Sequence, residues 1–567
     1  MPLPFVRTAV VRLPLLLLLF PLTAMAQQPA NRLAEAQRMV AAGQPDSALP
    51  VLRALLQDEP KNGRAWLLLG ATHRALGQTD SAVDAYQHAI GFPRAKPIAV
   101  GALFALSVQA HQMDAAATWF EQLRSSASTD LSGLAADTSL HILHDDARFA
   151  SLFPDRITFE PPFVEPVRII QEWRGASRGD EFGWIARPIG DVDGDKVTDV
   201  AVTAPQNAPY GATNGLVYLF SSRKGKLLWK QVGTTGALLG TSLEAAGDVN
   251  GDHIPDVIAG APGINTAFVY SGRDGKLLLT LTGDSVDHGF GGGVSGVGDV
   301  NDDGRADLLV GASGSNSNGA GSGRAIFFSG RDGKRLLAIP GDTAGDAFGS
   351  AVGGAGHAIL IGAVGAGPNR TGRLFVYDRL SLRPKFVVES DSTGAAFAGM
   401  FLSTLGDVDG DGTPDIYATD FPNSASGPAT GRAYVFSGRT GKPVITLTGD
   451  TPGAGFGIGV GRTGDLNHDG HDDLVIGAWQ YPGAAWSGGR VTVYSGKDGA
   501  VLQEFTGKVP GETLGFDAVG VGDVDGDGAT DFLITSAWSM VNGVRSGRTY
   551  IVAGCVGSRT GSCPAVH

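Results

Sequence analysis

Asp523-Val-Asp-Gly-Asp-Gly-Ala-Thr-Asp531 carries carboxylates at the first, third, fifth and ninth positions of a nine-residue stretch. Calcium takes about six to eight oxygen ligands, so a short loop can bind it when alternate side chains and one backbone carbonyl face inward. Here the carbonyl would come from the seventh position, and a glycine at the sixth, Gly528, tolerates the positive φ of a tight loop. The stretch therefore predicts a calcium-binding loop.

The same pattern recurs five more times, with asparagine replacing aspartate at the third position of three copies. The predicted ligands, the seventh residue of each loop contributing its carbonyl, are Asp191, Asp193, Asp195, Val197 and Asp199; Asp248, Asn250, Asp252, Ile254 and Asp256; Asp299, Asn301, Asp303, Arg305 and Asp307; Asp407, Asp409, Asp411, Thr413 and Asp415; Asp465, Asn467, Asp469, His471 and Asp473; and Asp523, Asp525, Asp527, Ala529 and Asp531. These loops predict up to six calcium ions. Lys196 and His253 replace the sixth-position glycine in the first two loops, which predicts weaker binding there.

The loops are regularly spaced along the chain. They begin at residues 191, 248, 299, 407, 465 and 523, so the intervals are 51 to 58 residues, except for one of 108. Near residue 356, inside that long interval, Phe348-Gly349 and Ile361-Gly362-Ala363 keep the flanking pattern around a segment without acids. Seven repeats therefore fill residues 166–554, and a fixed period of this size indicates a propeller or an array.

Each repeat reads as four short strands in a meander, but the last repeat lacks a fourth strand. Its third strand, residues 547–552, is followed only by a C-terminal tail. At the other end, Ile169-Ile-Gln-Glu-Trp-Arg-Gly175 precedes Phe182 at the spacing of a fourth strand. Because ring closure leaves fewer unpaired strand edges, we expect residues 167–175 to pair with residues 547–552 and complete an all-β seven-bladed propeller.

The flanking motifs of the repeats resemble a known family. Phe-Gly pairs at 182, 290, 348 and 456, Gly260-Ala-Pro262 and the acidic hairpins together resemble the FG-GAP repeats of the integrin alpha-subunit head, over roughly 390 residues. Leu239-Gly and Leu514-Gly depart from the pattern. The resemblance implies that the metal loops join the first two strands of each blade on one face, and that ligands meet the opposite face.

The loops predicted for that opposite face differ in aromatic content. The sixth blade contributes Trp479, Tyr481 and Trp486, the seventh contributes Trp538, and the first, its neighbour in a closed ring, contributes Tyr210. Aromatic side chains are enriched at recognition sites, so these residues predict binding of a protein or a surface glycan. The alternative is that they fold down as lids over the blade ends.

Residues 31–124 follow a different period, of 34 residues. Gly43, Gly77 and His111 align, and the copy around Trp66, Gly70, Ala82 and Tyr86 closely resembles a tetratricopeptide repeat. This segment is therefore expected to be a short all-α solenoid, with a possible protein or peptide partner on its variable positions. Residues 125–165, polar at first and proline-rich at the end, are expected to form a linker.

The chain termini predict an exported protein. Residues 1–26 combine two arginines, an apolar run and the small-residue end Ala24-Met25-Ala26, which is typical of a cleavable signal peptide. Beyond it, no apolar stretch is long enough to span a membrane. In the tail, residues 555–567, Cys555 and Cys563 predict a disulfide in an oxidising compartment, with a free pair as the alternative. The expected location is secreted, periplasmic or cell-surface.

Charge and motifs restrict the function. A formal charge of −13, concentrated in the acidic loops, disfavours nucleic-acid binding. No catalytic motif is recognisable, and Arg178-Gly-Asp180 lies in a stretch of common turn residues. We expect an exported, calcium-binding, non-enzymatic interaction or adhesion module. The alternatives are a quinoprotein-like oxidoreductase, because residues 221–229 and 271–279 faintly resemble that family's docking strands, and a purely structural envelope component.

Overall fold

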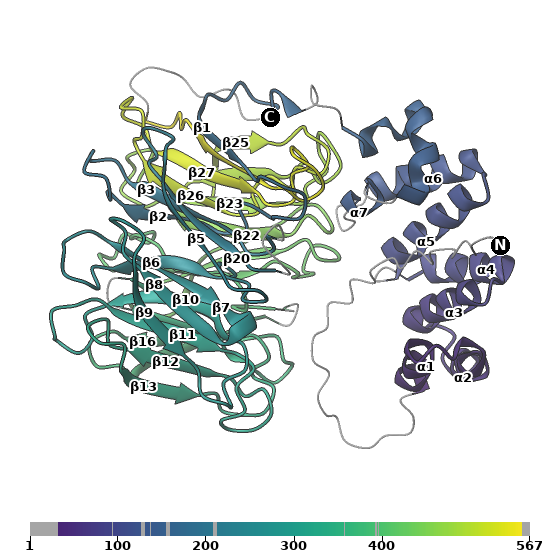
Figure 1. The fold of residues 1–567 in the computed structure, drawn as a ribbon, viewed down its shortest axis with the longest axis horizontal. Coiled ribbons are helices and arrows are strands. Elements are labelled where there is room, and N and C mark those ends of the chain that lie inside the picture. Colours follow the sequence, from purple (N-terminus) through teal and green to yellow (C-terminus); the bar gives the residue numbers. More distant parts are fainter. Residues whose placement is uncertain are drawn as a thin grey trace, which may run out of the picture.

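The computed structural model of the protein describes residues 32–92, 95–125, 131–135, 138–154, 159–207, 213–355, 358–391, 394 and 396–557. An α-helical segment is followed by seven four-stranded sheets arranged as a propeller (Figure 1). The predicted combination of a tetratricopeptide-like solenoid and a seven-bladed propeller is confirmed. The predicted signal peptide, Tyr210 and Cys563 lie outside the described residues. None of the described helices is both long and apolar enough to cross a bilayer.

The helical segment is built from three helical hairpins. These are α1 (Arg32–Ala41) with α2 (Pro45–Asp58), α3 (Gly63–Ala75) with α4 (Thr79–Ile90), and α5 (Lys96–Gln109) with α6 (Met113–Arg124). The aligned residues Gly43, Gly77 and His111 share a left-handed backbone, with φ of 72°, 72° and 55°. Gly70 is required by close packing, because a Cβ there would lie 2.7 Å from the ring of Tyr86. Short elements α7 (Ser132–Ala135), η1 (Thr138–Asp145) and η2 (Ala147–Leu152) follow.

Six blades are meanders of four consecutive strands, and the seventh combines both ends of the propeller. The strands are β1 (Ile169–Arg174); β2 (Ala186–Gly190), β3 (Asp199–Ala204), β4 (Leu216–Phe220) and β5 (Leu227–Val232); β6 (Leu243–Gly247), β7 (Asp256–Ala261), β8 (Thr266–Tyr270) and β9 (Leu277–Thr282); β10 (Phe290–Gly298), β11 (Asp307–Ala312), β12 (Arg324–Phe328) and β13 (Arg335–Pro340); β14 (Phe348–Ala355), β15 (Ala358–Ala363), β16 (Arg373–Asp378) and β17 (Pro384–Glu389); β18 (Leu402–Thr404), β19 (Ile416–Asp420), β20 (Arg432–Phe436) and β21 (Pro443–Thr448); β22 (Phe456–Arg462), β23 (Leu474–Ala478), β24 (Arg490–Tyr494) and β25 (Val501–Thr506); and β26 (Ala518–Gly522), β27 (Asp531–Ser536) and β28 (Arg548–Val552). A short helix, η4 (Pro262–Ile264), follows β7.

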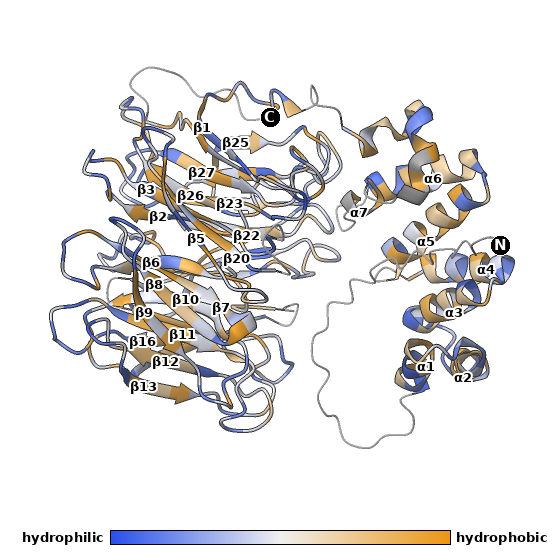
Figure 2. Ribbon diagram, in the orientation of Figure 1, coloured by the Kyte–Doolittle hydropathy of each residue, from blue (hydrophilic) through white to orange (hydrophobic). Residues whose placement is uncertain are grey.

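The second strand of every blade is buried along its whole length. Seven hydrophobic clusters each combine side chains of two neighbouring blades, so the core lies between the sheets and runs around the ring. In Figure 2, hydrophobic residues are concentrated on the strands, and hydrophilic residues lie on many of the connecting loops. Burial on both faces explains why these strands are apolar without alternation.

Close backbone contact between blades explains the glycines of the repeat motif. A Cβ on Gly260 would lie 1.9 Å from the carbonyl oxygen of Gly291, and one on Gly311 would lie 2.1 Å from that of Gly349. Gly291 and Gly349 follow the motif phenylalanines and have φ of 86° and 83°, which glycine adopts without strain. The phenylalanine itself is buried, Phe290 completely. Phe290-Gly291 and Phe348-Gly349 therefore pack on the Gly-Ala pair of the preceding blade.

The N-terminal strand closes the ring as predicted. β1 pairs with β28 in antiparallel register from Ile169↔Val552 to Arg174↔Arg548. Arg548 is fully buried at this seam, and its Nε lies 2.8 Å from Oε1 of Glu172. Its Nη1 lies 3.7 Å from Oε1 of the buried Glu512. The seam is therefore held by ladder hydrogen bonds and by a buried ion pair.

The helical segment packs against the sixth and seventh blades. Phe149 and Leu152 share a hydrophobic cluster with Trp486, Val509 and Met540 of the propeller. The Trp486 indole donates a hydrogen bond to the Ser151 carbonyl at 2.9 Å. These propeller residues lie between second and third strands or between blades, and in a meander such loops lie opposite the first-to-second-strand loops. The helices therefore cover part of the face opposite the acidic loops, which agrees with Figure 1.

The end of the expected linker is ordered along the sixth blade. The Val164 N–H donates to the Thr506 carbonyl at 2.9 Å, and the Thr506 N–H donates to Oε2 of Glu165 at 2.7 Å. Phe163 is buried in the cluster between the sixth and seventh blades. This part of residues 125–165 therefore attaches the helices to the propeller.

We predict that Glu172→Ala lowers the free energy of unfolding by about 2–3 kcal/mol, because the buried Arg548 guanidinium loses its nearest carboxylate. Glu160→Ala is the matched control, since Glu160 pairs with Arg174 at 2.9 Å in an exposed position and should contribute less than about 1 kcal/mol. Urea unfolding measures both changes. Equal losses would show that ring closure does not depend on the buried pair.

Candidate metal centres

The six acidic loops each join the first and second strands of a blade, so all six lie on one face. They connect β2 to β3, β6 to β7, β10 to β11, β18 to β19, β22 to β23 and β26 to β27. In the fourth blade only two residues separate β14 from β15, which leaves no room for a nine-residue loop. The loops therefore lie where the sequence predicts them.

The first-position aspartate shapes each loop by accepting backbone hydrogen bonds. In the first loop, Oδ1 of Asp191 accepts the N–H groups of Gly194 at 2.7 Å and Asp195 at 3.1 Å, and Oδ2 accepts that of Lys196 at 2.8 Å. Oδ1 and Oδ2 of Asp523 accept the corresponding N–H groups of the seventh-blade loop. This side chain therefore curls the loop backbone around itself.

The ninth-position aspartate is buried at the base of each loop. Asp199 is fully buried and accepts the N–H groups of Val192 at 3.0 Å and Ser222 at 3.1 Å. Burial, with a smaller contribution from the neighbouring carboxylates Asp193 and Asp195, raises the pKa of Asp199 to about 6. Burial likewise raises the pKa of Asp531 to about 7. The loop interior thus disfavours negative charge unless a cation is close.

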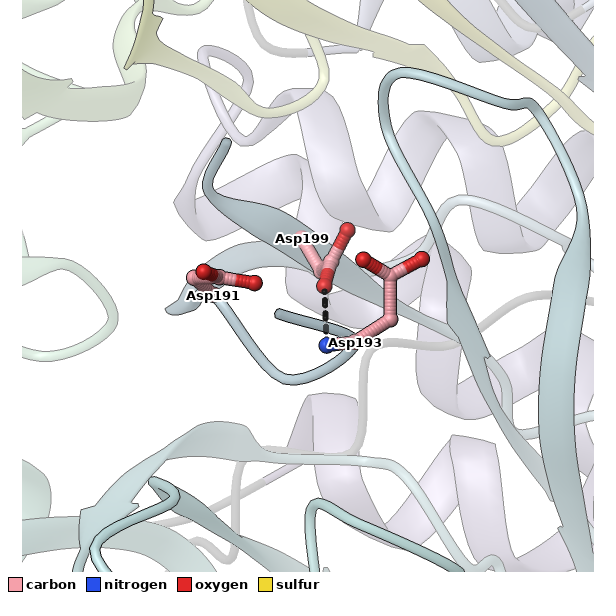
Figure 3. A group of neighbouring side chains, drawn as sticks. All are labelled: Asp191, Asp193 and Asp199. Atoms are coloured by element: carbon pink, nitrogen blue, oxygen red, sulfur yellow. Dashed lines mark hydrogen bonds between the residues drawn. The ribbon is translucent and has the colours of Figure 1, made fainter. Parts of the chain in front are cut away.

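The donor set fits a hard divalent cation. In the first, fifth and seventh blades one carboxylate oxygen from the first, third and ninth positions lies within 4.8 Å of the others, as for Asp191, Asp193 and Asp199. Figure 3 shows the Asp199 carboxylate between the other two. Oδ1 of Asp193 is buried without a hydrogen-bond partner among the described residues. An unpartnered buried oxygen within a cluster of carboxylates is chemically suited to calcium.

The two loops without a sixth-position glycine keep the same backbone. Lys196 and His253 have φ of 68° and 64°, in the left-handed region that Gly528 occupies at 92°. A side chain there costs roughly 1–2 kcal/mol relative to glycine. The predicted weakness of these two loops therefore has a physical reason, and it stays a prediction.

The predicted ligand-face aromatics separate into two groups. Trp479 and Trp538 are half-buried and in edge contact, with ring centroids 4.6 Å apart. Half-buried Tyr481 lies under the Arg490 guanidinium, 4.0 Å from the ring centroid. Trp486 differs from the expectation, because it is only 5% exposed beneath the helical segment. It is an interdomain packing residue, and the sequence could not indicate this because the contact joins segments more than three hundred residues apart.

Trp479 and Trp538 belong to an aromatic cluster that includes two residues not predicted from the sequence, Phe516 and Trp184. Phe516 lies 5.3 Å from Trp479, centroid to centroid, and Trp184 lies 4.9 Å from Phe516. Both stand two residues after the start of a Phe-Gly or Leu-Gly pair, where Ile458 stands in the sixth blade and smaller residues stand in the second to fourth. The sequence could have indicated this cluster, because a large apolar residue stands at this position in the sixth, seventh and first blades, which are neighbours in the closed ring.

Two further sequence features are placed by the structure. Asp180 is buried and accepts hydrogen bonds from Asn207 Nδ2 at 2.8 Å and from the Ser177 N–H at 2.8 Å. The Arg-Gly-Asp tripeptide is therefore part of a turn, and its carboxylate faces the interior. Cys555 follows β28, and Cys563 lies outside the described residues, so the disulfide stays a prediction.

The fold and its loops define a seven-bladed propeller with acidic first-to-second-strand hairpins, and comparisons with known proteins identify the repeat. Residues 182–220, 239–275 and 290–328 match the FG-GAP repeat, and residues 407–476 match an FG-GAP-like repeat. Residues 39–92 match a tetratricopeptide repeat. The chain thus carries FG-GAP repeats in its propeller and a tetratricopeptide repeat in its helical segment.

Integrin alpha subunits are similar to part of this chain. Integrin alpha-2 of Bos taurus is 33% identical over 168 residues, covering 26% of this chain and 14% of that protein. Integrin alpha pat-2 of Caenorhabditis briggsae is 31% identical over 244 residues, covering 36% of this chain and 19% of that protein. Integrin alpha-IIb of Homo sapiens is 39% identical over 94 residues, covering 16% and 9%. The chain thus spans less than a fifth of the length of these relatives.

We predict that Asp525→Ala reduces the calcium-dependent part of the melting temperature, because a third-position ligand is lost. Asp302→Gly is the matched control: it removes one carboxylate from the fourth position of the third loop, where four other loops carry glycine. Asp302 is exposed and has φ of 59°, so glycine fits without strain. Melting in calcium and in EDTA gives the increment, and an equal reduction in both variants would contradict the ligand assignment.

Proposed function

We propose that the protein is an exported, calcium-binding, non-enzymatic interaction or adhesion module. In this proposal up to six calcium ions occupy one propeller face, and a protein or surface-glycan ligand binds the opposite face. The observation that carries the proposal is the combination of six acidic hairpins on one face with a contiguous aromatic cluster on the other. The distant likeness to integrin alpha subunits supports the same class.

Calcium is supported by the charge of the loops. Twenty-one carboxylates stand at ligand positions of six loops, and the whole chain has a formal charge of −13. Two like charges about 4 Å apart repel by about 4 kcal/mol at an effective dielectric constant of 20. Cations bound in the loops would relieve this repulsion and tie the first two strands of each blade together.

A recognition role for the opposite face is supported by its half-buried aromatics. Trp184, Trp479 and Trp538 gather around Phe516 at the ends of the first, sixth and seventh blades. The indole nitrogens of Trp479 and Trp538 are buried, so the exposed part of each ring is apolar. Large, half-buried aromatic surfaces favour binding of a partner that brings apolar contact area.

The helical segment adjoins this surface, because it covers Trp486 and Met540 in the same two blades. We propose that a protein or peptide partner of the helical repeats would therefore bind beside the propeller ligand. Export is supported by the leader-like residues 1–26. A secreted, periplasmic or cell-surface location would provide the millimolar calcium at which extracellular modules commonly bind it.

We predict that Trp479→Ser combined with Trp538→Ser weakens binding of the labelled full-length protein to cells of its source organism by about tenfold or more, since aromatic anchors dominate recognition surfaces. Flow cytometry with increasing protein concentration gives the apparent Kd. Unchanged affinity would place the ligand elsewhere on the molecule.

Two controls accompany this experiment. Lys196→Ser combined with His253→Ser alters exposed side chains on the acidic-loop face and should leave cell binding unchanged. Trp486→Ser should lower the melting temperature, because this buried indole packs under the helices and donates to the Ser151 carbonyl. Loss of binding in the Lys196 and His253 variant would point to the acidic face instead.

A further inference from the structure

The turn between the third and fourth strands of the first blade departs from its repeat at one position. It reads Ser221-Ser-Arg-Lys-Gly-Lys226, where the second blade reads Ser271-Gly-Arg-Asp-Gly-Lys276. In the other blades that carry both this turn and an acidic loop, the fourth turn residue is again an acid or a hydroxyl: Asp332, Thr440 and Asp498. Lys224 therefore places a cation where its counterparts carry none.

The usual fourth residue stabilises the turn itself. Oδ1 of Asp274 accepts the Lys276 N–H at 3.1 Å, and Oγ1 of Thr440 accepts the Lys442 N–H at 3.3 Å. Lys224 reaches the acidic loop instead. Its Nζ lies 2.7 Å from Oδ2 of Asp193 and 3.2 Å from Oδ2 of Asp195, the third- and fifth-position ligands.

Lys224 is a second basic residue at the acidic loop, because the third residue of the turn already supplies one. Nη1 of Arg223, the third residue of the same turn, donates to the Asp195 carbonyl at 3.1 Å. In the second blade the equivalent Arg273 places Nε 3.0 Å from Oδ2 of the fifth-position Asp252. The first loop therefore receives two cations from one turn, and one of them contacts the third-position ligand.

The acidic loop of the seventh blade also contacts a basic side chain, which comes from a different segment of the chain. Arg168, just before β1, pairs with Asp525, and its Nη2 lies 3.6 Å from Oδ2 of Asp527. The Arg168 carbonyl accepts the Ala553 N–H at 2.9 Å, so the backbone is fixed while the side chain, 56% exposed, can turn to solvent. The loop of the first blade differs from that of the seventh blade, because Lys196 replaces the sixth-position glycine.

We propose that Lys224 is an internal counter-cation that competes with calcium for the third- and fifth-position carboxylates of the first loop. This inference rests on the proposed calcium binding. The Lys224 side chain is 51% exposed, whereas those of Asp193 and Asp195 are 14% and 13% exposed, so Lys224 can withdraw into water as an ion enters. The first loop is then the weakest of the six sites and the last to fill.

The competition predicts opposite effects with and without calcium. Without calcium, Lys224 neutralises part of the first loop and stabilises it. With calcium, the same side chain must leave its partners, and its withdrawal reduces the apparent affinity. A variant without this charge should therefore bind calcium more tightly in the first loop and be less stable in EDTA.

Lys224→Thr tests this, because threonine is the native residue at the same turn position in the fifth blade. Lys226→Thr is the control, since it removes the same charge from the same exposed turn two residues away. Equilibrium dialysis of the full chain against graded free calcium gives the number of ions and the weakest dissociation constant. Removing an exposed ion pair should lower that constant by about threefold to fivefold in Lys224→Thr alone.

Each result of this experiment either supports or overturns the inference. A lower weakest constant in Lys224→Thr, with a lower melting temperature in EDTA and neither change in Lys226→Thr, supports the inference. An unchanged constant, or equal tightening in both variants, overturns it while leaving calcium binding intact. Absence of bound calcium in the unmodified protein contradicts the proposed calcium binding itself, and with it the inference.

Discussion

Repulsion among carboxylates is the constraint on which this structure depends. Each loop holds three or four of them, and the ninth-position aspartate is buried with a raised pKa, as Asp199 shows. Backbone N–H groups of the loop donate hydrogen bonds to these carboxylates. The first-position Asp191 accepts three of them, and the buried Asp199 accepts others. Hydrogen bonds disperse the charge without cancelling it, so cations bound in the loops would decide how firmly the first two strands of a blade are joined.

Blade packing transmits this local order around the ring. The second strand of every blade is buried between neighbours, and Gly260 and Gly311 allow the next blade's backbone to approach. Because β1 supplies the outer strand of the seventh blade, the ring closes through residues at both ends of the propeller. The buried Arg548 links that strand to the seventh blade, close to where the helical segment is attached. Loops, closure and helices are thus parts of one connected structure.

Much of this could be predicted because the determinants are local and repeated. The nine-residue acidic pattern fixed the loop positions, and the spacing of Ile169–Gly175 before Phe182 identified the closing strand. What escaped prediction depends on contacts between distant segments. The burial of Trp486 arises from helices that no local pattern places, and the cluster of Trp184 with Phe516 needs neighbouring blades side by side. The reach of Lys224 to Asp193 likewise depends on a turn approaching a loop of another hairpin.

Thermal unfolding of the full-length protein in millimolar calcium, in magnesium and in EDTA tests the central claim most directly. Sites filled at about a hundred times their Kd would each contribute about 2.7 kcal/mol, so chelation should lower the melting temperature by more than about 10 °C, and magnesium should restore little of it. An unchanged melt in excess EDTA would contradict the account, because it would mean that the acidic loops are held together without calcium.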